Sequence, residues 1–220
     1  MPSVRLLSPT VPVYTVNGAE PGPTVLVQAG IHGDEVAGVH ALQELLEERF
    51  RPLRGRVLFV PVMNPGAYRA RARTAPGGLD LNRSFPGDVA APEIERRLAA
   101  RFMALVRDER PVVVATLHES RTLYSPDVTP SFGQTLVYGV TPCPPALTRV
   151  VDRLNLQVVD PQERWSTLYY PVSTSSTEVI VDTFGCVGTC VETWMGLPER
   201  RRIDLQKTVV RALFEEFGLC

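Results

Sequence analysis

Residues 24–35 read TVLVQAGIHGDE, and this stretch decides the fold. Its first half, residues 24–29, is a short apolar run rich in valine, which is typical of a strand buried on both faces of a sheet. In the second half, Gly30 and Gly33 lie on either side of His32, and Glu35 follows His32 by three residues. From Glu35 to Phe50, apolar residues recur at the 3.6-residue period of a helix with one buried face. A strand, a loop and a helix in this order predict the first unit of an α/β domain.

The same alternation continues along the chain. Apolar runs at residues 56–62, 112–117 and 135–140 predict further buried strands. Helical periodicity over residues 92–105, 146–154 and 198–217 predicts helices, the last ended by Gly218 in the left-handed conformation. Residues 11–16 predict hairpin-like strands at an antiparallel edge. We therefore expect one domain over residues 1–220, an α/β fold of three α/β/α layers around a mixed, mostly parallel central sheet.

The composition argues against a nucleic-acid-binding protein and against a membrane protein. The formal net charge is −1 with acidic and basic residues interspersed, so neither a nucleic-acid partner nor a polyphosphate is expected. No run reaches the roughly 18 apolar residues of a membrane span, and the first ten residues lack a signal-peptide pattern. We expect a cytoplasmic protein without a membrane partner. The cysteines lack Cys-x-x-Cys spacing and are expected to be buried free thiols, although Cys186 and Cys190 lie close enough to Glu192 for a role beside a site.

His32 and Glu35 occupy the place where open α/β sheets bind ligands, beyond the carboxyl end of a strand. A catalytic zinc ion takes three protein ligands and leaves one position to water, so a third ligand is needed. Of the three histidines, His40 lies about 12 Å along the predicted helix at 1.5 Å per residue, too far to share the ion. His118 follows residues 112–117 and would emerge beside His32 if the two strands are parallel. The sequence thus predicts a zinc site of His32, Glu35 and His118.

Two further features of the sequence suit a hydrolase site beside the metal, a candidate carboxylate-binding pair and a candidate general base. Asn82 and Arg83 are adjacent in a loop (residues 80–87, DLNRSFPG) and together suit a carboxylate, which the planar guanidinium can bind through both oxygens. Glu192 closes the apolar segment 186–191, where desolvation would raise its pKa toward that of a general base. A solvated turn and a solvated strand end explain these residues equally well.

The order of these motifs resembles the zinc carboxypeptidase superfamily and is also similar to its branch of succinylglutamate desuccinylase and aspartoacylase. The resemblance extends over residues 29–192 and rests on dispersed motifs in the family's order and spacing: His32-x-x-Glu35, Asn64-Pro65, Asp80-Leu81-Asn82-Arg83-x-Phe85-Pro86, Leu117-His118 and Val191-Glu192.

The resemblance implies a role for each of these residues. It makes His32, Glu35 and His118 the ligands of one zinc ion and Glu192 the general base that activates the attacking water. The remaining roles that it implies are carboxylate binding by Asn82 and Arg83, polarisation of the scissile carbonyl by Arg73, and coverage of the substrate by a mobile tyrosine, Tyr170. Two alternatives stay open, because Arg69 and Arg71 alternate with Arg73 and because Tyr169 precedes Tyr170.

The chain also departs from the family pattern. Glu119-Ser120 follow His118 where many family peptidases have a serine and an aromatic residue, and Thr177, at the position that resembles the reader of the terminal side chain, is uncharged. The desuccinylase branch usually has a further C-terminal β domain, whereas here 28 residues, 193–220, follow Glu192. The first two departures give no support to a preference for a charged terminal side chain, and the last favours an open cleft and a peptide or amino-acid amide as substrate.

We therefore expect a zinc-dependent, metallocarboxypeptidase-like amidase that hydrolyses an amide bond next to a free carboxylate, acting on a small peptide or an acylated amino acid. One alternative is an N-acyl-amino-acid deacylase that uses the same residues. An alternative of another class is a non-catalytic binding module that contains the metal.

Overall fold

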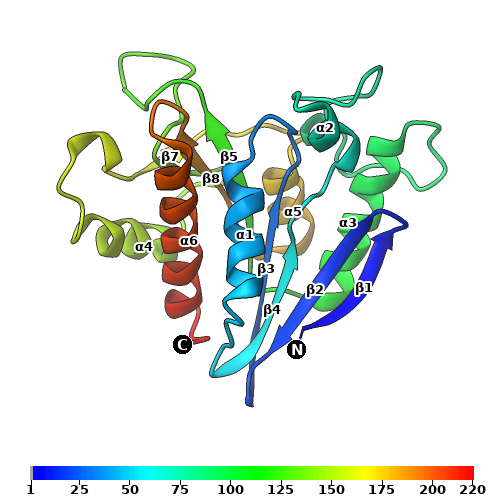
Figure 1. The fold of residues 1–220 in the computed structure, drawn as a ribbon, viewed down its shortest axis with the longest axis horizontal. Coiled ribbons are helices and arrows are strands. Elements are labelled where there is room, and N and C mark those ends of the chain that lie inside the picture. The colour runs from blue at the N-terminus through cyan, green and yellow to red at the C-terminus, as the bar shows by residue number, and fades with distance from the viewer. Residues whose placement is uncertain (1) are drawn as a thin grey trace.

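In the computed structural model, which describes residues 2–220, the apolar runs form an eight-stranded sheet with helices on both faces (Figure 1). The strand order across the sheet is β1-β2-β4-β3-β5-β8-β6-β7. The strands are β1 (Ser3–Ser8), β2 (Val11–Asn17), β3 (Glu20–Ala29), β4 (Arg54–Val60), β5 (Val113–Ser120), β6 (Thr135–Tyr138), β7 (Ser166–Tyr169) and β8 (Val187–Trp194).

The four central strands, β4, β3, β5 and β8, are parallel to one another. Their carboxyl ends therefore meet at one edge of the sheet, where parallel α/β sheets bind ligands. The antiparallel pairings are β1 with β2, β2 with β4, and β6 with β8, while β6 and β7 are parallel. The mixed, mostly parallel sheet predicted from the sequence is confirmed, as is the antiparallel edge predicted around residues 11–16.

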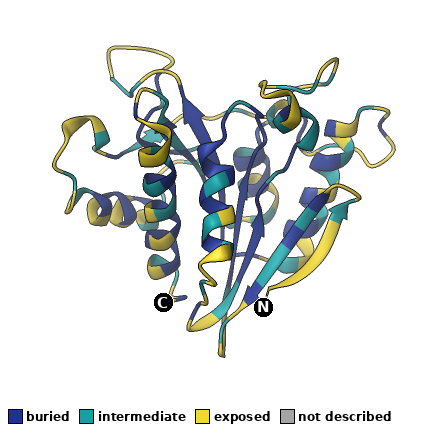
Figure 2. Ribbon diagram, in the orientation of Figure 1, coloured by how far each residue is buried: buried dark blue, intermediate teal, exposed yellow. Residues whose placement is uncertain are grey.

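Helices cover the two faces of the sheet in separate groups. One face is covered by α1 (Ala37–Glu47), α4 (Pro145–Asn155) and α6 (Glu199–Glu216), and the other by α3 (Ile94–Glu109) and α5 (Ser176–Phe184). Successive strand residues point to opposite faces, so Val25 and Val27 pack with the first group and Leu26 with the second. In Figure 2 the central strands and the inward faces of the helices are mostly buried, whereas the edge strand β1 and the outward helix faces are exposed. Of the helices in residues 2–220, none is long and apolar enough to cross a membrane.

The structure corrects several boundaries. Neither His118 nor Glu192 ends its strand: β5 continues to Ser120 and β8 to Trp194, because the two strands pair with each other along their whole length. Glu35 lies in the loop before α1 and not in the helix itself, which begins at Ala37.

Several short elements were not predicted. The irregular stretch 64–91 contains α2 (Pro65–Ala70) and the 3₁₀ turn η1 (Leu81–Arg83), and a second 3₁₀ turn, η2 (Pro161–Glu163), precedes β7. α5 was also missed. Each of α2, η1 and α5 begins at a side chain that caps it, Asn64, Asp80 and Ser175 respectively. Elements this short carry too few residues to show a periodicity in the sequence.

Candidate metal and substrate site

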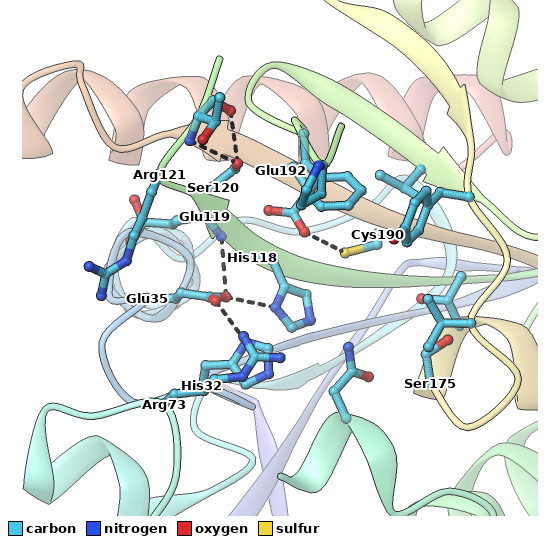
Figure 3. A pocket seen from close by; sticks show the side chains of 18 of the residues that line it. His32, Glu35, Arg73, His118, Glu119, Ser120, Arg121, Ser175, Cys190 and Glu192 are labelled. Carbon is cyan, nitrogen blue, oxygen red and sulfur yellow. Dashed lines mark hydrogen bonds and ion pairs between the residues drawn. The ribbon is translucent and has the colours of Figure 1, made fainter. Parts of the chain in front are cut away.

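The predicted site residues converge on one cavity of about 430 Å³ at the carboxyl ends of β3, β5 and β8 (Figure 3). His32 and Glu35 enter it from the loop between β3 and α1, and His118 enters it from β5. All three side chains are buried. The cavity is thus located at the edge of the sheet that the sequence indicated.

Glu35 lies between the two imidazoles. His32 Nδ1 is 2.7 Å from Glu35 Oε1, and His118 Nδ1 is 2.7 Å from Glu35 Oε2. The ring centroids of the two histidines are 4.8 Å apart. One nitrogen from each ring and both carboxylate oxygens are therefore directed at the same small volume.

This donor set fits a divalent metal ion. The three residues offer ligand atoms that lie within 4.8 Å of one another. Two imidazole nitrogens and one carboxylate are a ligand set of catalytic zinc, which keeps a fourth position for water or substrate. Their burial adds to the fit, because a bound cation compensates the buried carboxylate of Glu35.

The charges of the triad depend on one another. Burial raises the pKa of Glu35, but the adjacent imidazoles of His118 and His32 outweigh it and hold the pKa well below the usual range. Burial lowers the pKa of His32, yet Glu35 and Asp80 together raise it to about 9. Burial lowers the pKa of His118. The two histidines therefore differ in protonation when no metal is bound.

Asp80 links the triad to Arg73. Its Oδ1 is 3.3 Å from His32 Nε2, while its Oδ2 accepts hydrogen bonds from Arg73 Nε and Nη2 at 3.0 and 2.8 Å. Arg73 lines the cavity, whereas Arg69 and Arg71 do not. Arg71 lies over the ring of Tyr68 instead, 5.1 Å from its centroid. Of the three alternating arginines, Arg73 is the one that faces the site.

Glu192 lies beside His118, its register partner across β5 and β8. Cys190 donates a hydrogen bond from its thiol to Glu192 Oε1 at 3.4 Å, as Figure 3 shows. Burial and the negative charge of Glu35 raise the pKa of Glu192 to about 8. A carboxyl group in this position exchanges its proton close to neutral pH, which suits a general acid–base.

The amide orientation of Asn82 is determined by α5. Asn82 Oδ1 accepts hydrogen bonds from Ser176 N and Oγ at 3.0 and 3.2 Å, which leaves its NH₂ group free to donate. Arg83 also lines the cavity and, in residues 2–220, forms no ion pair with a carboxylate. An amide donor and an unpaired guanidinium side by side suit an incoming carboxylate.

Tyr170 and Tyr169 face different surroundings. Tyr170 lines the cavity and packs edge-to-face on Phe132, with ring centroids 4.8 Å apart. Tyr169 packs on Tyr138 and is not part of the cavity wall. His40 lies outside the site as well, near Glu199 and the hydroxyl of Tyr68.

Other residues around the site were not identified from the sequence. Glu119, which departs from the family pattern, forms a buried ion pair with Arg202 and accepts a hydrogen bond from the backbone N–H of Ala37 at 2.9 Å. Its own backbone N–H donates to Glu35 Oε2 at 3.2 Å. Gln206 donates to the carbonyl of His118 at 2.8 Å. Because α6 is far from β5 along the chain, no local pattern reveals these contacts.

Part of the sequence is similar to known proteins. Residues 21–112 match the model of the succinylglutamate desuccinylase/aspartoacylase catalytic domain. N-alpha-acetyl-L-2,4-diaminobutyric acid deacetylase of Halomonas elongata is 41% identical over 115 residues, which are 51% of this chain and 33% of that protein. Succinylglutamate desuccinylase of Burkholderia pseudomallei is 48% identical over 67 residues, 29% of this chain and 18% of that protein. The matches thus span a third or less of these curated relatives.

Solved structures share the fold. A product-bound cell shape determinant protein of Helicobacter pylori overlaps with a TM-score of 0.85 at 18% identity, over 96% of this chain and 56% of that chain. Succinylglutamate desuccinylase/aspartoacylase of Rhodobacter sphaeroides overlaps with a TM-score of 0.73 at 22% identity, over 95% of this chain and 59% of that chain. The three-layer fold predicted from the sequence is confirmed.

Proposed function

We propose that this chain, which lies in the zinc carboxypeptidase-like branch of succinylglutamate desuccinylase and aspartoacylase, is a metal-dependent hydrolase of an amide bond next to a free carboxylate. One observation carries the proposal. The His32, Glu35 and His118 cluster, the buried carboxyl of Glu192 and the free donors of Asn82 and Arg83 all line the same cavity.

The metal that we propose is a single zinc ion held by His32, Glu35 and His118. When bound with one open position, zinc lowers the pKa of water toward neutrality and polarises a carbonyl group. The protein's part is to hold the three ligands in place. Asp80 orients His32 from its far nitrogen, and the N–H of Glu119 orients Glu35.

Glu192 is the general acid–base in this proposal. It lies beside His118 in the cavity wall, and a cation bound by Glu35 would favour its ionised form, which can take a proton from the attacking water and pass it to the leaving amine. Arg73, held in place by Asp80, stabilises the negative charge that develops on the carbonyl oxygen.

Substrate binding follows from the remaining polar residues of the cavity. Asn82 Nδ2 and the guanidinium of Arg83 bind the free carboxylate, and Tyr170 closes over it. The leaving group is therefore an amino acid, and the acyl group on its nitrogen extends past the metal ligands.

The acyl group distinguishes two candidate functions. We favour a small acyl group and hence an N-acyl-amino-acid deacylase, since the matching curated relatives are named as a deacetylase and a desuccinylase. A peptidyl group would make the chain a carboxypeptidase, the function that the sequence pattern favoured. Zinc-loaded protein should be assayed on N-acetyl and N-succinyl amino acids and on dipeptides. Faster cleavage of dipeptides would reverse our choice, and inertness to every substrate would support the binding-module alternative.

Replacing Glu192 tests the mechanism. Glu192→Gln keeps the size of the side chain and removes its ability to accept a proton, so we expect kcat to fall by about 10²–10⁴-fold. Zinc content, measured by metal analysis, should remain that of the unmodified protein. His40→Gln, outside the cavity, is the matched control and should leave kcat unchanged. If Glu192→Gln turns over substrate at the original rate, the general base lies elsewhere.

A further inference from the structure

Glu178 lies in the cavity wall without a partner. It is a residue of the first turn of α5, and its Oε2 atom is buried with no hydrogen-bond partner. Within the described part of the chain it forms no ion pair. The residue as a whole is half-buried, but this oxygen is shielded from solvent, and a donor from a ligand in the cavity would compensate it.

Capping of α5 does not account for the carboxylate. The pattern Ser175-x-x-Glu178 matches a capping box, in which the glutamate side chain would return to the N–H of the capping serine. Ser175 makes the first of the two hydrogen bonds of a capping box, since its Oγ accepts a hydrogen bond from Glu178 N at 3.3 Å. However, Ser175 N donates to the carbonyl of Val172 at 2.8 Å. The carboxylate of Glu178 is left free for the cavity.

Gly139, another residue of the cavity wall, makes room for this carboxylate. A Cβ atom at residue 139 would lie 3.0 Å from Glu178 Oε2. On the same turn of α5, Ser176 holds the side chain of Asn82. The first turn of α5 therefore contributes both Ser176, which holds Asn82 of the proposed carboxylate-binding pair, and the negatively charged side chain of Glu178.

Apart from Glu192, which the proposed mechanism uses, the cavity thus presents two charged side chains without an ion-pair partner in the described protein, the guanidinium of Arg83 and the carboxylate of Glu178. A ligand that compensates both carries a carboxylate and a cationic amino group. We propose that Glu178 binds the side-chain amino group of the substrate and selects amino acids whose side chain ends in an ammonium. This inference rests on the proposed function and names its substrate class.

Paired substrates test the selection. For zinc-loaded protein, we compare kcat/KM for Nα-acetyl-lysine and Nα-acetyl-ornithine with that for Nα-acetyl-norleucine, which is similar in length and uncharged. We expect a preference of about tenfold or more for the ammonium substrates, the range of a hydrogen bond between charged groups. Glu178→Gln should reduce this ratio to about one, through a lower kcat/KM for the two ammonium substrates.

Two further variants separate charge from structure. Asp182→Asn removes an exposed negative charge from the same helix and should keep the preference. Gly139→Ala keeps the charge of Glu178 but displaces its carboxylate, so it should weaken the preference. Equal rates on charged and neutral substrates, faster cleavage of Nα-acetyl-glutamate, or an unchanged ratio in Glu178→Gln would each overturn the inference.

Product binding distinguishes failure of the inference from failure of the proposed function. If no substrate is cleaved, the proposed hydrolase fails. The affinities of lysine and norleucine for the zinc-loaded protein, measured by calorimetry, still test Glu178. Tighter binding of lysine that is lost in Glu178→Gln supports the inference, and equal binding overturns it.

Discussion

At the scale of single residues, His32 is held between two carboxylates, Glu35 at 2.7 Å from Nδ1 and Asp80 at 3.3 Å from Nε2. These neighbours raise its pKa to about 9 against the effect of burial. Because a metal binds only the neutral imidazole, binding must release this proton. We expect the apparent zinc affinity to rise about tenfold per pH unit from pH 6.5 and to level off near pH 9, as measured by competition with a chelator.

The same shift has a consequence for the metal-free protein. The folded pKa of His32, about 9, exceeds the ordinary histidine value of 6.5 that holds in the unfolded chain, so the stability it contributes is complete below pH 6.5 and is lost as the pH rises through about 9. Asp80→Asn removes one of the groups that raise this pKa and should move the plateau of zinc affinity to lower pH. A zinc affinity that does not change between pH 6.5 and 9 would contradict this account of His32.

At the scale of elements, the loop that carries His32 and Glu35 is packed against α2. A Cβ atom on Gly33 would lie 1.9 Å from the carbonyl oxygen of Ala67, and Gly33 N donates to the carbonyl of Ala72 at 2.9 Å. We expect Gly33→Ala to lower the free energy of unfolding by about 1–3 kcal/mol and to weaken zinc binding, because the backbone of the loop must move. Urea unfolding measures the first effect and chelator competition the second.

Gly77→Ala is the matched control for this prediction. Gly77 has a φ of +71° but no heavy atom within 4 Å of an added Cβ. Its replacement should cost only the backbone strain of about 1–2 kcal/mol and leave zinc affinity unchanged. Weaker zinc binding in Gly77→Ala, or unchanged zinc binding in Gly33→Ala, would show that the contact with α2 does not position the ligands.

At the scale of the whole molecule, the proposed metal links strand β5 with the loop that follows β3, and β3 and β5 are neighbours in the central sheet. A ligand that binds only the folded state stabilises it by mass action, by about 4 kcal/mol when its free concentration is 1,000 times Kd. We expect zinc to raise the midpoint of thermal unfolding and a chelator to reverse the increase.

Two variants show whether this stabilisation comes from the site. His118→Asn should abolish most of the increase, since it removes one of three ligands. His40→Gln, which leaves the site intact, should retain it. An equal effect of zinc on both variants would mean that zinc binds elsewhere.

The sequence alone predicted the parts of the molecule whose cause is local. Apolar runs and 3.6-residue periods predicted β3, β5, α3 and α6, because burying an apolar stripe requires one secondary structure in each case. The convergence of His32, Glu35 and His118 also followed, since parallel strands bring their carboxyl ends to one edge. The roles proposed for these residues remain predictions, as do those of Glu192, Asn82, Arg83, Arg73 and Tyr170.

Only the tertiary structure decided which polar groups are paired and which are left free. Asp80 binds Arg73 and not Arg71, Ser176 orients Asn82, and Glu178 faces the cavity instead of capping its helix. The physical reason is that desolvation and hydrogen bonding depend on what packs against a side chain, and these partners come from distant parts of the chain. The sequence indicated the edge of the sheet at which the proposed site lies, while the packing of α2, α5 and α6 around that edge determined which of its polar groups are paired.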